Sequence, residues 1–151
     1  MGQEQGRGFE PATGDGPEPP ASGRAAEVGT AYEGLLQIRR LVGGPAGASV
    51  PAPWEVRQTP RAVALVLEAA GIPPSALDAE GRRTRTGYRV SAAAEPGRAE
   101  VTWAGPPGAG AAGEEQERLA DCAAALERAG WVCLLYRGPR RRRFLEVEPP
   151  R

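Results

Sequence analysis

The chain has 151 residues, a length that suits one domain with a core of moderate size. Its 19 basic and 19 acidic residues cancel, and this zero net charge argues against a generic nucleic-acid-binding domain, which is usually basic. Neither histidine nor lysine occurs, which excludes a Ser-His-Asp triad, an imidazole acid–base catalyst and a Schiff-base lysine. With two cysteines and no histidine, the usual zinc ligand sets are missing as well, so we expect neither a cofactor nor an enzyme.

The composition also bears on the origin and location of the protein. Every basic residue is an arginine, and alanine, glycine and proline are abundant, as in proteins from high-GC bacterial coding sequences. Codon bias of this kind weakens a run of arginines as evidence of function. No apolar run approaches the ~20 residues of a membrane span, and the first residues do not resemble a signal peptide. We therefore expect a cytoplasmic protein without a membrane partner.

The N-terminal part of the chain differs from the remainder. Residues 1–26 are acidic and rich in glycine and proline, and they have no hydrophobic period, which predicts a disordered tail. Residues 27–151 are expected to form a single small domain. Its first helix covers residues 27–42 and ends at a glycine pair, where a Gly/Pro linker over residues 43–58 begins.

A second helix and a hairpin follow the linker. The helix has Thr59 as its predicted N-cap and Pro60 at its first position, and Gly71 ends it. Residues 87–104 then alternate between apolar and polar side chains, with a turn at residues 95–98. This alternation predicts two antiparallel strands with one solvated face.

The C-terminal part contains one more helix and two more strands. After a Gly/Pro linker at residues 105–113, residues 114–129 have the clearest helical period of the chain. The stretch 131–136 is apolar at every position, which predicts a strand that is covered on both faces and central in its sheet. Residues 144–148 form the last strand. The predicted order is α-α-β-β-α-β-β, an α+β fold with a small four-stranded, mostly antiparallel sheet packed against helices.

The connectivity predicts an arrangement of these strands. The second and third strands are joined through a helix, so we expect them to be parallel, with a right-handed crossover and a sheet order of 2-1-3-4. The last helix then covers one face of the sheet and the first two helices cover the other. Residues 137–143 form the tip of the last hairpin, where Gly138 and Pro139 make the turn.

This tip is rich in arginines that can bind phosphate groups, and arginines in the loop before the first strand can extend the patch. The residues are Arg137, Arg140, Arg141, Arg142 and Arg143 at the tip, and Arg82, Arg83 and Arg85 in the loop. No aromatic residue is interleaved with the run, and no helix-turn-helix or RNA-binding motif accompanies it. The other interpretation, which we favour, is a solvated turn that pairs with the acidic helix over residues 114–129.

Two further patterns give distant alternatives. Residues 108–113 match G-x-G-x-x-G, but acidic residues fill the start of the next helix, and no acidic residue lies ~20 positions further on to hold a ribose. We therefore interpret this motif as a linker rather than a nucleotide site. Cys122 belongs to an apolar helix stripe and Cys133 has no evident base, so a thiol-dependent enzyme also ranks low.

The large apolar residues provide the last candidate site. Trp54 lies in the linker, where we expect it to pack over the fold as a clasp, although an exposed tryptophan would suit docking. If one face of the sheet is uncovered, an apolar patch can bind a protein partner of unknown identity. The patch residues are Trp54, Trp131, Leu135 and Phe144. The sequence thus predicts a small non-catalytic binding or accessory module that acts through protein–protein interaction, with nucleic-acid contact through residues 137–143 as the alternative.

Overall fold

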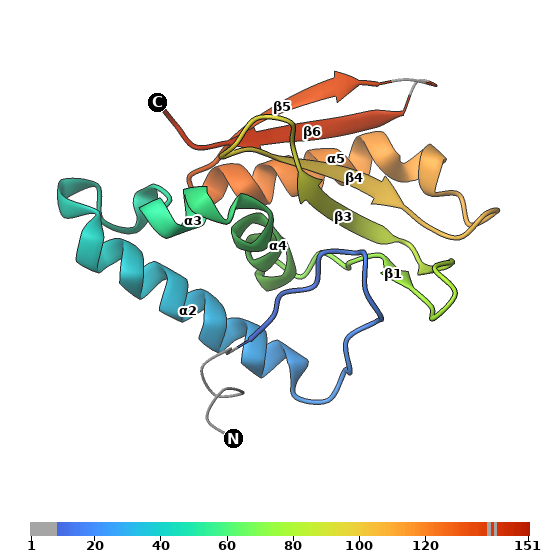
Figure 1. Ribbon diagram of the computed structural model, residues 1–151, viewed down its shortest axis with the longest axis horizontal. Coiled ribbons are helices and arrows are strands. Elements are labelled where there is room, and N and C mark those ends of the chain that lie inside the picture. The colour runs from blue at the N-terminus through green and yellow to red at the C-terminus, as the bar shows by residue number, and fades with distance from the viewer. Residues whose placement is uncertain (1–8, 139, 141) are drawn as a thin grey trace.

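A computed structural model describes residues 9–138, 140 and 142–151 and has the predicted α+β fold (Figure 1). The helices and strands are α2 (Arg24–Val42), the 3-10 helix η1 (Gly44–Ser49), α3 (Pro53–Arg57), α4 (Thr59–Ala69), β1 (Ala76–Leu77), β2 (Arg83–Arg85), β3 (Gly87–Ala92), β4 (Ala99–Ala104), α5 (Ala111–Arg128), β5 (Val132–Arg137) and β6 (Arg143–Glu148). Strands β3 to β6 form one sheet, and β1 and β2 form a separate two-stranded sheet. The predicted order of the long elements is therefore confirmed, and the short elements are additions to it.

The main sheet has the strand order β3-β4-β6-β5, and each pair of neighbours is antiparallel. The predicted order 2-1-3-4 is wrong. β4 and β5 do run parallel, as their connection through α5 requires, but β6 returns between them and pairs with both. Leu145 and Val147 of β6 pair with Val101 and Ala99 of β4, so their side chains extend the apolar face of the first hairpin. Burial of these side chains is what places β6 in the middle of the sheet.

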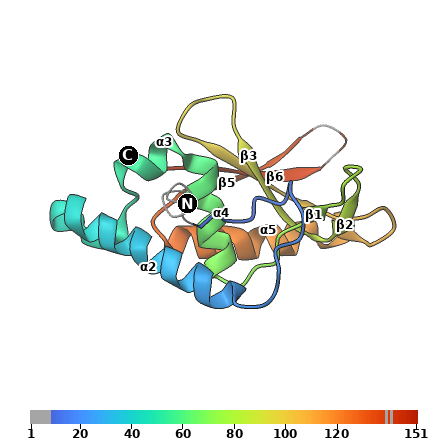
Figure 2. The same ribbon diagram turned by 60° about the horizontal axis from the view of Figure 1, so that its bottom comes forward.

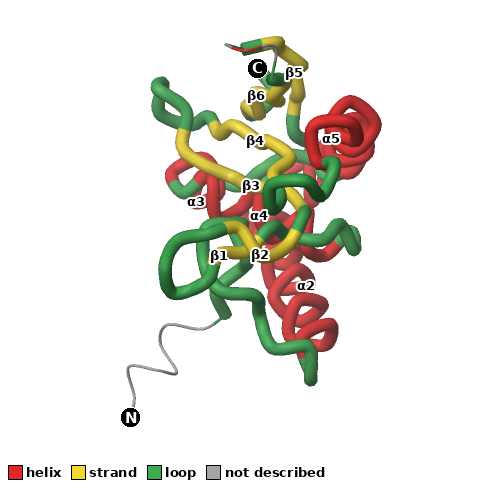
Figure 3. Tube along the Cα trace, turned by 90° about the vertical axis from the view of Figure 1, so that its right-hand side faces the viewer, coloured by secondary structure: helices red, strands yellow, loops and turns green. Residues whose placement is uncertain are grey.

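The two helices that pack on the sheet cover the same face, so the predicted cover on both faces is wrong. One continuous core contains Val63, Val66 and Leu67 of α4, Leu119 and Leu126 of α5, and Tyr88, Val90, Val101, Trp103, Leu145 and Val147 of the sheet. β5, which the sequence predicts to be central, is an edge strand at one margin of the sheet (Figure 3). Burial on both faces therefore does not explain why β5 is apolar at nearly every position.

The helix ends lie close to their predicted positions. α4 begins at Thr59, but its N-cap is Gln58, and the Thr59 hydroxyl donates to the carbonyl oxygen of Val56 at 2.7 Å. The prediction of a Thr59 cap is therefore wrong. Gly71 follows the helix with φ +84°, in the left-handed region that favours glycine after a helix end, as predicted.

The part of the N-terminal segment that the structure describes, residues 9–23, is bound to the fold, contrary to the predicted disorder; residues 1–8 lie outside the described residues. The N–H of Val90 donates to the carbonyl oxygen of Thr13 at 2.7 Å, and the Tyr88 hydroxyl donates to that of Ala12 at 2.8 Å. Figures 1 and 2 show the segment running past β1 and β3 before α2 begins. Composition predicted disorder because the segment has little apolar surface of its own, whereas its order comes from hydrogen bonds to a strand edge.

The predicted Gly/Pro linker contributes to a buried ion pair that no sequence pattern indicated. Arg39 of α2 and Glu55 of α3 are 1% and 0% exposed. Their two bonds, from Nε to Oε2 and from Nη2 to Oε1, are both 2.8 Å long. Arg39 Nη1 also donates to the carbonyl oxygens of Ala48, at 2.9 Å, and Ala129, at 2.7 Å. One guanidinium group thus joins α2, η1, α3 and the end of α5.

Trp54, from the same linker, packs as the clasp that the sequence predicts. It contacts a second small cluster formed by Val28 and Leu35 of α2 and Leu65 of α4. Its indole N–H is buried and has no hydrogen-bond partner within the described part of the chain. The tryptophan therefore stabilises the packing of α3 against the helical layer through apolar contact alone.

We expect Arg39→Ala to lower the free energy of unfolding by about 3–5 kcal/mol, because it leaves the Glu55 carboxylate buried without its cation. Urea denaturation measures the change. Arg40→Ala is the matched control, since the neighbouring Arg40 is exposed and bonds to Gln37, and this change should stay within about 0.5 kcal/mol. Equal losses in the two variants would contradict a structural role specific to Arg39.

Candidate functional site

The arginine tip is attached to α5 through one buried carboxylate. Glu115 is 2% exposed. Its Oε2 accepts a hydrogen bond from Arg142 Nε at 2.7 Å, and its Oε1 accepts one from the backbone N–H of Arg143 at 2.8 Å. Arg142 Nη2 also donates to the carbonyl oxygen of Trp103 at 2.8 Å. These two arginines therefore have partners inside the fold. This is what we expect of a turn that pairs with the acidic helix.

Arg83 and Arg85, which the sequence places in a loop, lie in the short strand β2 and also bind groups within the fold. Arg83 Nη2 binds Asp15 Oδ1 at 2.7 Å, and its other terminal nitrogen donates to the carbonyl oxygen of Gly14. Arg85 binds Glu18 at 2.7 Å. The acidic groups of the N-terminal segment thus neutralise two of the loop arginines that the sequence suggests as an extension of the phosphate-binding patch. Arg82 is exposed.

Two tip arginines remain as solvated cations. Arg137, at the end of β5, and Arg140 are both exposed, and neither pairs with a carboxylate among the described residues. Arg141 and Pro139 lie outside the described residues, so the predicted turn at Gly138 and Pro139 is described only in part. The described arginines of the tip and of the earlier segment therefore do not form one patch of unpaired cations.

A different surface stands out, the β5 surface, which we define as Val132, Leu134, Leu135, Tyr136 and Phe144. Val132, Leu134 and Tyr136 are 38%, 46% and 43% exposed, and their alternation places them on the open face of the sheet. Leu135 pairs with the buried Leu145 and so lies on the α5 face, yet it is 48% exposed. Phe144 of β6 stacks on Tyr136, with ring centroids 5.5 Å apart.

The predicted patch residues are only partly brought together. Leu135 and Phe144 belong to the β5 surface, while Trp131 is 2% exposed and lies in the main core. Trp54 packs against α2 and α4 rather than the sheet. Sequence reasoning missed Val132, Leu134 and Tyr136, because the apolar run was interpreted as a central strand. Their exposure follows from the sheet order, which strand periodicity does not reveal.

The backbone of β5 adds unpaired hydrogen-bonding groups to this surface. The N–H of Gly138 donates to Arg142 O at 2.6 Å, and hydrogen-bonded residues alternate with non-bonded ones along an antiparallel pair. Cys133, Leu135 and Arg137 therefore direct their N–H and C=O groups away from β6. Within the described part of the chain, no hydrogen bond reaches these outward groups.

At the opposite margin of the sheet, the outward backbone groups of β3 are hydrogen-bonded to other segments, unlike those of β5. Val90 and Tyr88 direct their backbone groups outward from β3, and these groups bond to Thr13, Pro73 and Ser75. The N-terminal segment and the loop before β1 thus cover the β3 edge. Since an uncovered apolar edge invites pairing with another chain, the contrast between the two margins marks β5 as the candidate site.

The two cysteines are poor nucleophiles. Burial raises the pKa of the Cys122 thiol to about 12, with a smaller effect from Asp121. Burial likewise raises the pKa of the Cys133 thiol to about 12, assisted by the nearby Glu127. Because the thiolate is the reactive form, both groups are protonated and unreactive near neutral pH.

The glycine-rich motif before α5 also has a local role. Gly110 adopts φ +84° as the N-cap of α5, and Glu114 in the first turn accepts a hydrogen bond from Trp103 Nε1 at 3.1 Å. Carboxylates therefore occupy the helix start where a pyrophosphate would bind. This arrangement agrees with a linker that positions α5.

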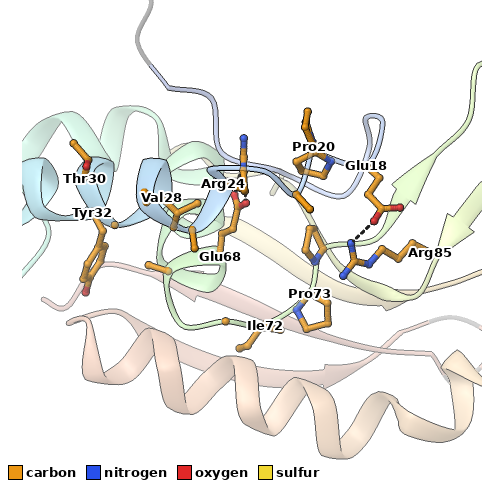
Figure 4. A pocket seen from close by; sticks show the side chains of 18 of the residues that line it. Glu18, Pro20, Arg24, Val28, Thr30, Tyr32, Glu68, Ile72, Pro73 and Arg85 are labelled. Atoms are coloured by element: carbon orange, nitrogen blue, oxygen red, sulfur yellow. Dashed lines mark hydrogen bonds and ion pairs between the residues drawn. The ribbon is translucent and has the colours of Figure 1, made fainter.

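A large groove lies between the N-terminal segment, the start of α2 and the end of α4 (Figure 4). Its two arginines are already paired: Arg24 binds Glu68 at 2.6 Å, and Arg85 binds Glu18 at 2.7 Å. The pairing with Glu68 raises the pKa of Arg24 further above its ordinary value. Since these charges serve the attachment of the segment, the groove lacks a converging set of groups that suggests chemistry.

The described residues also contain no cluster of three or more Cys, Asp or Glu side chains suited to a metal ion. Among the helices in the described ranges, none is both long and apolar enough to cross a membrane. Comparison with known proteins finds no match to a family model, a curated protein or a solved structure.

We expect Arg142→Ala to lower the free energy of unfolding by about 1–3 kcal/mol, because the buried Glu115 carboxylate loses its closest cation. Chemical denaturation measures the loss. Arg140→Ala, in the same run but without a carboxylate partner among the described residues, should change stability by less than about 0.5 kcal/mol. A nucleic-acid role for the tip predicts instead that both variants keep their stability and lose retention on heparin to the same extent.

The raised thiol pKa values predict slow alkylation of the folded protein. At pH 8 we expect iodoacetamide to label Cys122 and Cys133 at least about tenfold more slowly than it labels the denatured chain, measured by mass spectrometry. The rate should rise with pH, because a group of raised pKa releases its proton only in the alkaline range. Rapid labelling of either folded thiol at neutral pH would revive the thiol-dependent alternative.

Proposed function

We propose that this protein is a non-catalytic binding module that pairs with an extended protein segment along the edge of β5. The observation that carries the proposal is the combination of outward backbone groups at Cys133, Leu135 and Arg137 with the exposed apolar side chains of the β5 surface. In such strand addition, main-chain hydrogen bonds supply affinity and alternate side chains supply specificity.

The residue types of β5 favour a binding edge over an edge strand that is merely exposed to solvent. The edge strands of protein sheets are ordinarily protected from pairing with another chain by charges, prolines, bulges or a covering loop. β5 is six residues long, has no bulge in its pairing with β6, and carries a single charge, Arg137, at its end. An edge of this kind is an aggregation hazard unless it has a partner, which favours a binding role.

The alternative function, nucleic-acid contact through the arginine tip, has less support. Arg142 and Arg143 interact with Glu115, and Arg83 and Arg85 interact with Asp15 and Glu18. Among the described residues, phosphate binding would have to break these pairs or rely on Arg137, Arg140 and Arg82. Each phosphate contact adds roughly 0.9 to the slope of log affinity against log salt concentration. Three unpaired arginines within the described part of the tip and loop therefore favour weak binding with a small salt dependence.

The proposal predicts that a displayed library of random peptides yields binders with alternating apolar residues when it is selected on the wild-type protein. The double variant Leu134→Lys/Tyr136→Lys should bind them about tenfold or more weakly, because the charges oppose the apolar contact, as measured by biolayer interferometry. Leu41→Lys/Val42→Lys is the control, since both residues are exposed at the end of α2. If no binder distinguishes the β5 variant from the control, and the protein does not associate with itself through β5 either, the proposed function is wrong.

A further inference from the structure

The β5 edge is complementary to itself. We infer that its partner is β5 of a second copy of this chain, paired antiparallel about a two-fold axis that is perpendicular to the sheet and passes beside Leu135. This inference rests on the proposed function, because it names the occupant of the same edge. It makes one continuous sheet from two copies, with the order β3-β4-β6-β5 in each copy and the two β5 strands in the centre.

The position of the axis follows from which backbone groups point outward. Only outward-pointing residues can form hydrogen-bonded pairs with the second copy, and in β5 these are Cys133, Leu135 and Arg137. An axis at Leu135 pairs Leu135 with its own copy and Cys133 with Arg137 in both directions. All three residues then bond, whereas an axis moved to Leu134 or Tyr136 leaves one of them unpaired.

The side chains agree with the same register. On the open face, Leu134 of each copy lies beside Tyr136 of the other, which continues the stacked pair of Tyr136 and Phe144 into one apolar row. On the α5 face, Leu135 meets Leu135, and its present exposure of 48% indicates that α5 leaves room for this contact. Cross-strand aromatic and aliphatic pairs of this kind stabilise a sheet.

The charges are also complementary. β5 contains no acidic residue, and its single arginine lies at one end, so the two copies of Arg137 are held apart at opposite ends of the paired strands. Each Arg137 lies beside Cys133 of the other copy, and Glu127 is the carboxylate close to Cys133. The self-pairing therefore moves each exposed Arg137 toward the side of the other copy that carries the exposed Glu127 and away from the second Arg137.

The rest of the chain offers no better occupant. Residues 1–8 are the longest segment outside the description, and their sequence, MGQEQGRG, has one large apolar residue and no β-branched one. The described N-terminal segment is already bonded to β3, at the far margin of the sheet. An unrelated extended peptide fits the backbone groups, but it explains neither the Leu135 symmetry nor the position of Arg137.

Disulfide trapping tests the register. In a Cys133→Ala background, Leu135→Cys places two thiols opposite each other with a Cα separation of about 5.5 Å, within the range of a disulfide. We expect a covalent dimer after mild oxidation, seen on a non-reducing gel. Leu134→Cys alone and Tyr136→Cys alone should give little dimer, while an equal mixture of these two variants should cross-link. Cys122 remains buried in every variant and does not contribute.

Sedimentation velocity provides an independent readout on the unmodified chain. We expect a concentration-dependent dimer that weakens about tenfold or more in Leu134→Lys/Tyr136→Lys and stays unchanged in Leu41→Lys/Val42→Lys. Far-UV circular dichroism confirms that each variant is folded. Equal cross-linking at positions 134 and 135 indicates random collision and overturns the inferred register.

The outcomes separate this inference from the proposed function. A wild type that remains monomeric, with no trapping at position 135, overturns self-pairing; if selected peptides still bind at β5, the proposed function stands with another protein as the partner. Absence of both the dimer and the peptide binding removes both proposals. A dimer trapped through position 135 and weakened by the β5 lysines supports both.

Discussion

The buried pair of Arg39 and Glu55 is the interaction on which the arrangement of the helices depends. Neither charge can remain in the interior without the other, and the remaining donors of Arg39 bind the carbonyl oxygens of Ala48 and Ala129. Ala129 is the C-cap of α5, three residues before β5 begins at Val132. The pair therefore fixes where the chain leaves the helical layer and enters the last hairpin, and so contributes to the position of the edge strand.

The buried charged groups elsewhere and the outward backbone groups at the opposite margin of the sheet have partners as well. Glu115 is bonded to Arg142 and to the backbone of Arg143, and the outward groups of β3 are bonded to the N-terminal segment and the loop before β1. Among the described residues, the outward groups of β5 differ from those of β3 in having no such partner. A strand edge that remains unbonded beside exposed leucines and a tyrosine is the feature of this fold that favours association with another chain.

Arginine has several distinct roles in this protein, which is why its abundance was a poor guide to function. One guanidinium is buried among helices, others attach the N-terminal segment, and Arg142 binds a buried carboxylate at the base of the tip. A planar group with five donors suits all of these roles, since it can bind a carboxylate and carbonyl oxygens at once. The sequence RGPRRRR does not show which arginines have a partner, because the partners lie far away along the chain.

The sequence by itself determined the elements with strong local signals: the helices that became α2, α4 and α5, the hairpin of β3 and β4, and the glycine after α4. These depend on side-chain period and backbone freedom within a few residues. The tertiary structure decided the strand order, the single covered face, the ordering of residues 9–23 and the exposure of Leu134, Leu135 and Tyr136. Each of these depends on pairing between segments that are distant in the sequence. An apolar run such as 131–136 has the same pattern in a central strand as in an exposed edge strand, so the sequence alone does not distinguish the two.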